Sequence, residues 1–491
     1  MKRNMTISLL LVLCAAFILS SCGGSGTKTD TAVKVTETAA DTVETTTGEL
    51  KPDLPDSNFE GYEFVILDSN ASDTNGVDWV TYDVYTEEQN GDAINDAVYT
   101  RNLYLAETYN VVIKEFQGVT LTLAQKAVSS GDSIYDAVMT NFVAASTLAQ
   151  NGMTYDMYDI PYIDLSQPWW DQNGVETLSI GGHMNYATGD ITCIVNDATW
   201  TLMFNKQLAE DFNFDFYSLV DNDQWNFDLM YEMSTQVSAD KNGDGVRKFA
   251  DDQFGIIATG DIAQAFLYAG GMLIADKDAD DLPALKLDVD RMATVAEKAG
   301  AYCVDKEVMV SNHLDSSIST DNLRIGFQEA RALFYGECMQ CIKRMRESET
   351  DFGVIPWPKF FETQDRYYSF VHSTAGKCIT VPSTQTELER TGIVLEAMAA
   401  KSKYTLTVAY YDVSMTNKFI RDEESARMLD VILANRVYDL GYIYDWGGLY
   451  SGLRAVVTGN TGNFASKYES LTPAFNAAMQ KTVDYFLEHN A

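Results

Sequence analysis

The sequence predicts an α/β protein with two lobes. Segments of strand character alternate with helical segments over residues 61–141, and the alternation starts again over residues 187–337. Such alternation is typical of parallel sheets with crossover helices. The folded part, residues 58–491, would make one continuous sheet unusually large. Two lobes joined by crossing segments explain the chain better.

The first 57 residues are predicted to lie outside the folded part. Lys2 and Arg3 precede an apolar run that ends in two serines before Cys22, which is the layout of a secretory signal peptide over residues 1–21. The run is short for a membrane span, which needs about 20 apolar residues. Residues 19–22 resemble the bacterial lipobox, whose cysteine is lipidated and becomes the first mature residue. An ordinary signal peptide cut near Cys22 is the alternative.

Residues 22–57 predict a disordered tether. They are rich in Thr, Ser, Gly, Ala, Asp and Glu, and they contain no aromatic residue. Such a segment buries too little apolar surface to offset its chain entropy. A lipid on Cys22 and this tether would hold the folded part at the extracellular face of the cytoplasmic membrane.

The composition excludes several classes of partner. Hydrophobic residues make up 46% and aromatic residues 12% of the chain, as in a compact globular protein. The formal net charge of -36 repels nucleic acid, anionic headgroups and polyanionic substrates. A neutral or cationic ligand is therefore favoured, and no nucleic-acid partner is expected, although a local basic patch could override the net charge.

The first lobe is predicted to begin with a parallel sheet. Strands are expected at residues 61–67, 110–116 and 135–141. The helix between the first two strands has an apolar face formed by Ile94, Ala97, Val98, Leu105 and Tyr109. Ligands of such sheets bind beyond the carboxyl ends of the strands, and Asn70 and Asn141 lie just after two of these strands.

The second lobe repeats this pattern. An extended run followed by a helix is expected over residues 187–206, alternation continues over 253–335, and residues 332–337 form a strand that ends in an acidic turn. Residues 391–491 are mostly helical in pattern. The predicted lobes are residues 58–193 with a later segment near 372–410, and residues 194–371 with a C-terminal helical segment near 411–491.

Residues 240–251, DKNGDGVRKFAD, resemble a calcium loop of the EF-hand type. The ligands would be the side chains of Asp240, Asn242, Asp244 and Asp251 and the carbonyl of Val246, with Gly245 at the turn position. Asp at the last position is similar to the dockerin variant of the loop, and Asp252 is a possible substitute for Asp251. We expect a structural Ca²⁺ here, and a polar turn without metal is the alternative.

Aromatic residues beside acids suggest a sugar ligand. Trp446 lies among glycines and an acid in "YDWGG", and further rings occur in "PWWDQN" and "NDATW". Adjacent Trp169 and Trp170 are not expected to face one core. Packing is the alternative for any one tryptophan, and Trp446 is the residue expected to stack on a ligand.

The cysteines predict no disulfide framework. Beyond Cys14 and Cys22, five remain, an odd number. Cys338 and Cys341 have the spacing of a redox or zinc pair, but no second pair exists, so buried thiols are expected.

Common enzyme signatures are missing from the sequence. It contains no nucleophile elbow, P-loop, zincin motif or dinucleotide-binding fingerprint. The four histidines are far apart in the chain, so neither a histidine triad nor a histidine metal cluster is suggested. Glycoside hydrolysis by a pair of carboxylates stays an open alternative, because a chain with 71 acidic residues contains such pairs by chance.

Several stretches together resemble the family 1 extracellular solute-binding lipoproteins of Firmicutes, relatives of maltose-binding protein that serve sugar ABC transporters. The resemblance covers roughly residues 58–491. It is carried by GDAINDAVYTRN, DLSQPWWDQN, ATGDIT, FNKQLAEDF, DKNGDGVRKFADDQFG, GECMQCIKRMRESETDFGVIPWPKF, LERTGIVLEAMAA and RDEESARMLDVI. It implies a two-lobe periplasmic-binding-protein-like fold of type II, with a ligand cleft between lobes joined by a hinge, and delivery to a membrane permease.

By position, the resemblance implies a set of cleft residues. They are Asn70, Asn141, Asp197, Asp261, Gln264, Glu337 and Trp446. We expect a non-enzymatic receptor that binds a carbohydrate, either an oligosaccharide or a monosaccharide, and passes it to ABC transporter permease subunits. A surface glycoside hydrolase and a receptor for peptides or another polar solute are the alternatives.

Overall fold

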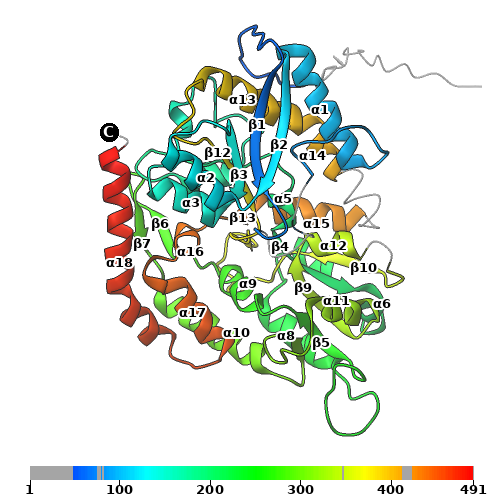
Figure 1. Cartoon of the computed structure of the whole chain (residues 1–491). Helices are drawn as coiled ribbons and strands as arrows, with labels where there is room; N and C mark the ends of the chain where they lie inside the picture. Colours follow the sequence, from blue (N-terminus) through cyan, green and yellow to red (C-terminus); the bar gives the residue numbers. More distant parts are fainter. Residues whose placement is uncertain (1–47, 74–78, 80–81, 346–347, 412–422, 490–491) are drawn as a thin grey trace, which may run out of the picture. The chain divides into compact units, whose positions relative to one another are not determined.

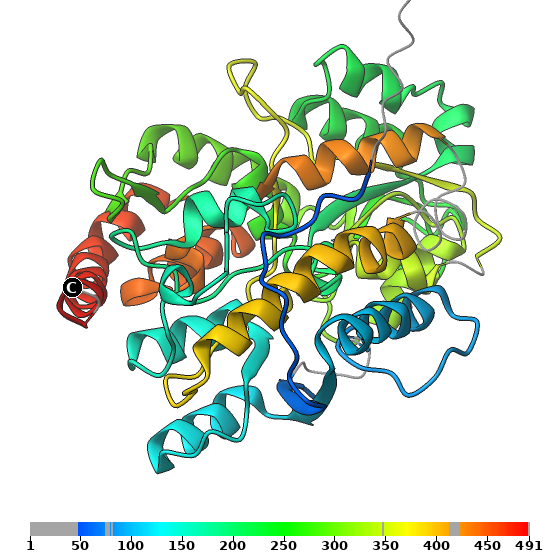
Figure 2. The ribbon, with the colours of Figure 1, turned by 90° about the horizontal axis from the view of Figure 1, so that it is seen from above.

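The computed structural model describes residues 48–73, 79, 82–345, 348–411 and 423–489. Residues 49–491 form one compact unit. Its ribbon contains two main sheets with helices around them (Figures 1 and 2). This arrangement is the α/β fold with two lobes that the sequence predicts.

The first sheet has the strand order β12-β3-β1-β2. Its bounds are β1 (Tyr62–Ser69), β2 (Val111–Gly118), β3 (Ala137–Asn141) and β12 (Lys377–Thr380). β1 pairs in parallel with β2 and β3, whereas β12 runs antiparallel to β3. The expected parallel strands are therefore confirmed, and a segment from much later in the chain completes the sheet.

Helices connect and cover this sheet. Their bounds are α1 (Ala93–Tyr109), α2 (Thr120–Ser130), α3 (Phe142–Gln150), α4 (Gln172–Leu178) and α13 (Leu388–Tyr404), with the short η2 (Met157–Asp159). α1 begins where the Asp92 side chain accepts hydrogen bonds from two backbone N–H groups, and it ends at Asn110 in the left-handed region with φ 51°. α1 packs on β2 and on α13.

The second sheet has the order β10-β4-β9-β5-β8. Its bounds are β4 (Trp200–Asn205), β5 (Phe254–Ala258), β8 (Met309–Ser311), β9 (Ala332–Cys338) and β10 (Phe352–Ile355). β5 is parallel to β8 and β9, while β4 is antiparallel to β9 and β10. Most of its strand residues are buried, as in a sheet covered on both faces.

The connections of the second sheet are mostly helical. They comprise α5 (Ile194–Asp197), α6 (Lys206–Asp211), α7 (Phe216–Asp221), α8 (Phe227–Val237), α9 (Ile262–Ala269), α10 (Val289–Val304), α11 (Thr320–Gln328), α12 (Gln340–Arg344) and the hairpin β6 (Ala275–Lys277) and β7 (Pro283–Leu285). The alternation expected over residues 253–335 is therefore confirmed.

The C-terminal part is mostly helical, as expected. It contains α14 (Leu406–Val408), α15 (Glu423–Ala434), β13 (Arg436–Val437), α16 (Leu440–Ile443), η4 (Trp446–Gly448), α17 (Leu449–Thr458) and α18 (Phe464–His489). α15 packs on β10, and α17 and α18 pack on α10. α18 also contacts α3 and β7, so it touches elements of both lobes.

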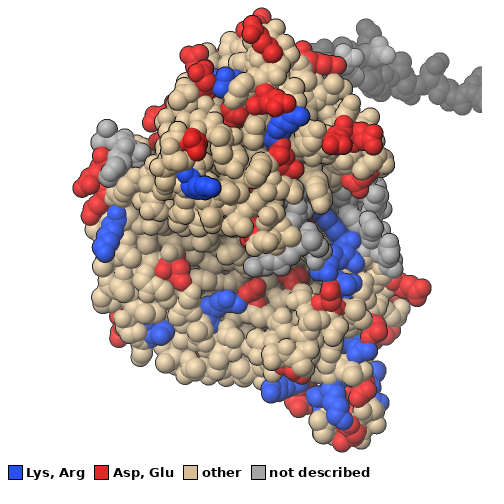
Figure 3. Space-filling model, viewed as in Figure 1, with Lys and Arg blue, Asp and Glu red and all other residues tan. Residues whose placement is uncertain are grey.

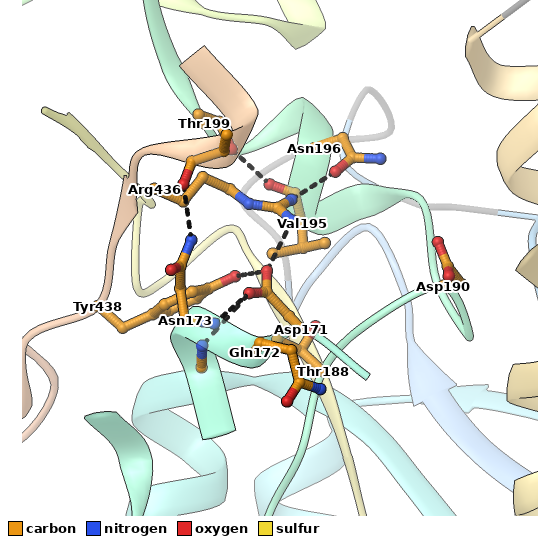
Figure 4. Close-up of polar contacts among 12 residues, drawn as sticks. Asp171, Gln172, Asn173, Thr188, Asp190, Val195, Asn196, Thr199, Arg436 and Tyr438 are labelled. Atoms are coloured by element: carbon orange, nitrogen blue, oxygen red, sulfur yellow. Dashed lines mark hydrogen bonds and ion pairs between the residues drawn. The ribbon is translucent and has the colours of Figure 1, made fainter. Parts of the chain in front are cut away.

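Three chain segments that join the sheets run side by side. β11 (Ser369–Phe370) pairs with β13, Thr199 forms a bridge with Val371, and the Val371 N–H donates to the Val437 carbonyl at 3.2 Å. Arg436 lies between Asp171 and Asn196 in this region (Figure 4). Its guanidinium donates to Asn196 Oδ1 at 2.5 Å and pairs with Asp171 Oδ2 at 2.6 Å.

The compact unit begins at residue 49, inside the segment 22–57 that the sequence predicts to be a disordered tether. Leu50 N donates to the Tyr404 hydroxyl at 2.8 Å, and Glu49 pairs with Lys401 at 3.0 Å. Glu49 and Leu50 therefore contact α13, and the partly buried Leu54 packs against the core. In the described part of the chain, no helix has both the length and the apolar character required to cross a membrane.

Candidate functional site

A pocket of about 420 Å³ lies at the carboxyl ends of β5, β8 and β9. Residues that follow these strands form one wall, and α11 and α12 extend it. His372, Thr374 and Ala375, from a crossing segment, and Trp79, from the connection between β1 and α1, supply the rest. The pocket therefore lies between elements of the two lobes, where α/β folds usually bind ligands.

Asp261 follows β5, and its carboxylate contacts the side chains of Arg454 and His372. One carboxylate oxygen pairs with the guanidinium of Arg454, and the other lies 3.5 Å from Nε2 of His372. Burial raises the pKa of Asp261, but the hydrogen bond to His372 and the charges of His372 and Arg454 hold it below its ordinary value. Asp261 therefore stays ionised in the lining of the pocket.

Glu337, near the end of β9, is in a different environment. Its Oε1 accepts the Cys338 backbone N–H at 3.0 Å and lies 3.1 Å from the Cys338 sulfur. Burial raises the pKa of Glu337 above its ordinary value. The pocket thus holds two carboxyl groups whose pKa values are shifted in opposite directions.

Two arginines approach the pocket from neighbouring helices. Arg324 of α11 and Arg344 of α12 both bond to Asp321, at 3.4 and 2.5 Å. Figure 3 shows Lys and Arg side chains gathered over the region of α12. The cleft is thus locally less acidic than the chain as a whole, whose net charge is -36.

A second pocket of about 650 Å³ adjoins the first. Gln340 and Arg344 line both pockets, and the second continues between α12, α5 and the segment from Tyr82 to Asn95. In its wall, Asp197 Oδ2 pairs with Lys343 Nζ at 2.6 Å, and Asp197 Oδ1 accepts from the Tyr410 hydroxyl at 2.7 Å. Asp197 is therefore part of a buried network that the second pocket touches.

The predicted site residues divide into two groups. Asp261 and Glu337 line the first pocket and Asp197 the second. Asn70 and Asn141 instead bond to nearby backbone: Asn70 Oδ1 accepts from Ser72 N at 3.0 Å, and Asn141, the N-cap of α3, accepts from Ala144 N at 2.9 Å. Gln264 is buried in α9 and accepts the Tyr450 hydroxyl. These three are not among the residues that line the two pockets.

Trp446, the residue expected to stack on a ligand, lies apart from the two pockets described above. Its ring is 3% exposed, stacks on Tyr444 at 4.7 Å between centroids, and donates from Nε1 to Thr482 of α18 at 2.9 Å. It borders a separate pocket of about 510 Å³ formed with α18. Left-handed Gly447 lets this loop approach the α18 backbone closely, so packing fixes the ring.

Three other tryptophans also serve packing. Trp169, Trp170 and Trp200 are at most 1% exposed. The first two share one core, because both indole N–H groups donate to the buried Glu396 carboxylate, at 2.9 and 3.0 Å. The expectation that adjacent rings cannot face one core is wrong here, since a single buried acceptor can bond both.

Sequence reasoning missed Trp79, Arg324, Arg344 and His372. Trp79 could have been found, because it follows the predicted first strand in the loop where Asn70 was expected to contact a ligand. The arginines and His372 gave no signal, since each lies in an ordinary helical or irregular segment. Only the approach of distant segments brings them together.

The loop at residues 240–251 is built from side-chain to backbone bonds. Asp240 accepts from Gly243 and Gly245 at 2.7 and 2.8 Å. Asp244 accepts from Val246 N at 2.9 Å and pairs with Lys248 at 2.5 Å. No set of three or more His, Cys, Asp or Glu side chains within the described ranges is placed to hold a metal. Calcium binding through Asp240, Asn242, Asp244, Val246 and Asp251 stays a prediction.

The cysteines agree with the expectation of buried thiols. Cys193, Cys303, Cys338, Cys341 and Cys378 are free and buried. Burial raises the pKa of Cys341 to about 12, so its thiol is protonated at neutral pH. Cys22, the predicted lipidation site, and residues 1–21 lie outside the described residues.

No family model and no curated protein match the chain. Solved structures share its fold. An ABC substrate-binding protein from Listeria monocytogenes in complex with cycloalternan has a TM-score of 0.53 and 10% identity, with 86% of this chain and 99% of that chain covered. The GacH receptor of Streptomyces glaucescens, studied unliganded and with acarbose, has a TM-score of 0.52 and 13% identity, with coverages of 87% and 98%.

A third similar structure is an ABC transporter solute-binding protein from Thermotoga lettingae bound with α-D-tagatose. Its TM-score is 0.52 at 11% identity, and 86% of this chain and 100% of that chain are covered. At these identities the likeness establishes the fold alone. The chain has the two-lobe α/β fold of periplasmic-binding-protein-like solute-binding proteins.

Proposed function

We propose that the chain is an extracellular solute-binding receptor of an ABC importer, which captures a carbohydrate between its lobes and delivers it to a membrane permease. One observation carries the proposal. The first pocket combines polar groups at the carboxyl ends of β5, β8 and β9 with an aromatic ring, Trp79, contributed from the other lobe. Similar structures were solved with cycloalternan, acarbose and tagatose, all of which are carbohydrates.

The chemistry of this pocket suits a hydroxylated ligand. Asp261 and Glu337 offer acceptors, while Arg324 and Arg344 offer donors. An aromatic ring beside such groups can contact the apolar face of a sugar while hydroxyls bond to the polar wall. A peptide or another polar solute is the main variant of this proposal.

We further propose that a lipid on Cys22 anchors the receptor at the extracellular face of the cytoplasmic membrane. The lipobox-like residues 19–22 and the polar segment after them support this location. An acidic surface, with a net charge of -36, suits a soluble domain that does not bind anionic headgroups.

Glycoside hydrolysis is the second candidate, and one observation favours it. Asp261 and Glu337 line the same pocket with pKa values shifted in opposite directions, as in pairs where one carboxyl donates a proton and the other stays ionised. However, the two oxygens of Asp261 are engaged by Arg454 and His372, which is better suited to positioning than to attack. Transport therefore remains the preferred function.

The test is to mix the purified protein with a panel of monosaccharides and oligosaccharides and to record calorimetric binding, melting temperature and product size. A receptor gives saturable binding and a higher melting temperature with unchanged sugars. Shortened products would instead establish a hydrolase, and the absence of binding to every sugar would remove the carbohydrate proposal.

Trp79→Ala should weaken binding of the sugar found in that panel by about 10- to 100-fold, since buried aromatic anchors dominate such contacts. The matched control is Tyr158→Ala, which truncates a 48% exposed ring outside both pockets. Equal affinity of the Trp79 variant and the control would show that the ligand lies elsewhere.

A further inference from the structure

A separate pocket of about 290 Å³ lies where the segments that join the two sheets run side by side. Its walls come from residues 168–173, from the segment that leads into α5, from α13, and from the end of α15 with β13. This crossing pocket shares no lining residue with the first and second pockets. It is therefore a cavity that the proposed sugar site does not use.

Two acids and two cations line the crossing pocket, and they form two pairs of different kinds. Arg436 pairs with Asp171 at 2.6 Å, and both side chains are largely buried. Lys403 Nζ lies 3.4 Å from Asp190 Oδ2, and the Lys403 side chain is 33% exposed. Asp190 is bonded to neither member of the first pair (Figure 4). The pair of Lys403 and Asp190 is therefore the one that a ligand can reach and separate.

The charge of Asp190 is incompletely compensated. Its Oδ1 accepts the Thr407 hydroxyl at 2.7 Å, and in the described part of the chain its Oδ2 has only the long contact with Lys403. Burial raises the pKa of Asp190 above its ordinary value, because Lys403, Thr407 and the charge of Arg436 only partly offset the cost of burying the carboxylate. An additional ammonium group at Oδ2 would supply the missing donor.

The crossing pocket also has unused donors. An ammonium group has three N–H donors, and that of Lys403 is engaged by the Pro168 carbonyl at 3.0 Å and by Asp190. Arg436 also lines the pocket, and its Nε is buried without a hydrogen-bond partner among the described residues. Cationic donors of this kind bind carboxylates.

The balance of charges determines which class of ligand fits. A simple anion would lie near Asp171 and Asp190, and a simple cation would lie near Lys403 and Arg436. Like charges at short distance repel each other, so a molecule with one charge of each sign matches the lining better. The volume of about 290 Å³ is close to the lower end of the range for small-molecule pockets, about 300–1,000 Å³. The ligand is therefore small.

We propose that the crossing pocket binds a small zwitterion of the α-amino-acid class, with its ammonium group on Asp190 and its carboxylate on Lys403 and Arg436. The ligand carboxylate replaces Asp190 as the partner of Lys403, so no charge is left unpaired. This site is separate from the proposed sugar site, and the inference does not depend on carbohydrate binding.

The test is calorimetric titration of the purified protein at pH 7 with glycine, L-alanine, L-serine and L-proline. Acetate and methylamine each keep one of the two charges of glycine, and propionate and ethylamine do the same for alanine. At least one amino acid should bind saturably. Glycine or alanine should bind about 10-fold more tightly than either of its single-charge counterparts, because a hydrogen bond to a charged group contributes on this order.

Variants assign the binding to this pocket. Lys403→Gln and Asp190→Asn should each weaken binding of the amino acid by about 10-fold. Asp190→Asn should also remove the difference between the amino acid and its carboxylate counterpart, because the ammonium group then has no anionic partner. Lys401→Gln is the matched control, since Lys401 lies on the same helix and pairs with Glu49 outside the pocket. Trp79→Ala, which alters the first pocket, should leave amino-acid affinity unchanged.

Three results would overturn the inference. The first is the absence of saturable binding of every amino acid to the folded protein. The second is equal affinity for an amino acid and its carboxylate counterpart, which would make the pocket a simple anion site. The third is loss of binding in Trp79→Ala with full binding in Lys403→Gln, which would place the amino acid in the first pocket. The sugar titrations test the proposed function independently, because they use a different ligand.

Discussion

At the scale of single residues, Glu396 shows how a sequence pattern can mislead. It lies in α13 and is 1% exposed, with one indole N–H on each carboxylate oxygen. Burial raises its pKa from 4.5 to about 7, because the hydrogen bonds from Trp170 and Trp169 only partly offset the cost of burying its charge. Two polar rings and one acid thus form a buried cluster, not a ligand platform.

This cluster predicts a pH dependence of stability. The folded state binds the proton of Glu396 more tightly than the unfolded chain, so the free energy of unfolding falls as the pH rises from about 5 to about 8. A pKa change from 4.5 to about 7 corresponds to about 3 kcal/mol. Glu396→Gln cannot ionise and should lose less stability over this range than the natural chain.

The measurement is urea unfolding of both proteins at several pH values. Glu396→Gln keeps the side-chain shape and one carbonyl acceptor, so the difference between the two curves isolates the titration. Two curves that stay parallel between about pH 5 and pH 8 would mean that Glu396 is ionised throughout.

At the scale of elements, the loop at residues 240–251 carries a prediction that does not involve the two pockets. It follows α8 and precedes β5, and it bears side chains of both charges, among them Lys248 paired with Asp244. For calcium to bind, Asp244 would have to exchange this ammonium for the metal. The carboxylates would also have to converge, at a cost set against the binding energy.

If calcium binds here, the melting temperature should rise with calcium concentration, by about 2.7 kcal/mol of stability at one hundred times Kd. Asp240→Ala should abolish the response. Asp278→Ala is the matched control, because Asp278 accepts turn N–H groups in the same manner, from Asp280 and Leu282. An unchanged melting temperature up to millimolar calcium would establish that the loop is only a turn.

At the scale of the whole molecule, a buried ion pair lies where the segments that join the two sheets run side by side. Arg436 on β13 bonds Asn196 of α5 and pairs with Asp171, whose Oδ2 also accepts the Tyr438 hydroxyl at 2.7 Å (Figure 4). The side chains of Arg436 and Asp171 are 14% and 3% exposed. This ion pair is thus largely removed from water, unlike a surface pair.

Arg436→Met should therefore destabilise the fold by about 3–5 kcal/mol, because Asp171 keeps its charge in a buried position without its cation. Asp171→Asn in the same chain should recover part of this loss. The measurement is a double-mutant cycle by urea unfolding. Additive effects of the two substitutions would mean that the ion pair contributes no coupling energy. The segments that join the sheets would then be held together there by their backbone bonds.

Local patterns in the sequence were sufficient for the elements and the fold class. The strands at the start of each lobe and the helix with Ala97, Val98 and Leu105 on its buried face follow from periodicity. Glu337 lies in the pocket lining, near the end of a strand that the pattern predicts, whereas Asp261 was expected only from the family resemblance. The ends of strands and the buried faces of helices depend on short-range chain geometry. A sequence pattern can therefore predict them.

Only the tertiary structure decided which polar and aromatic groups meet. Trp446 and Trp79 both lie in polar segments, yet one packs under α18 and the other borders the pocket. The first pocket also depends on Arg324, Arg344 and His372, which come from segments separated by long stretches of chain. Contacts of this kind depend on how elements that are distant in the chain pack against each other. Packing depends on how well whole surfaces fit, and a short stretch of sequence does not describe those surfaces.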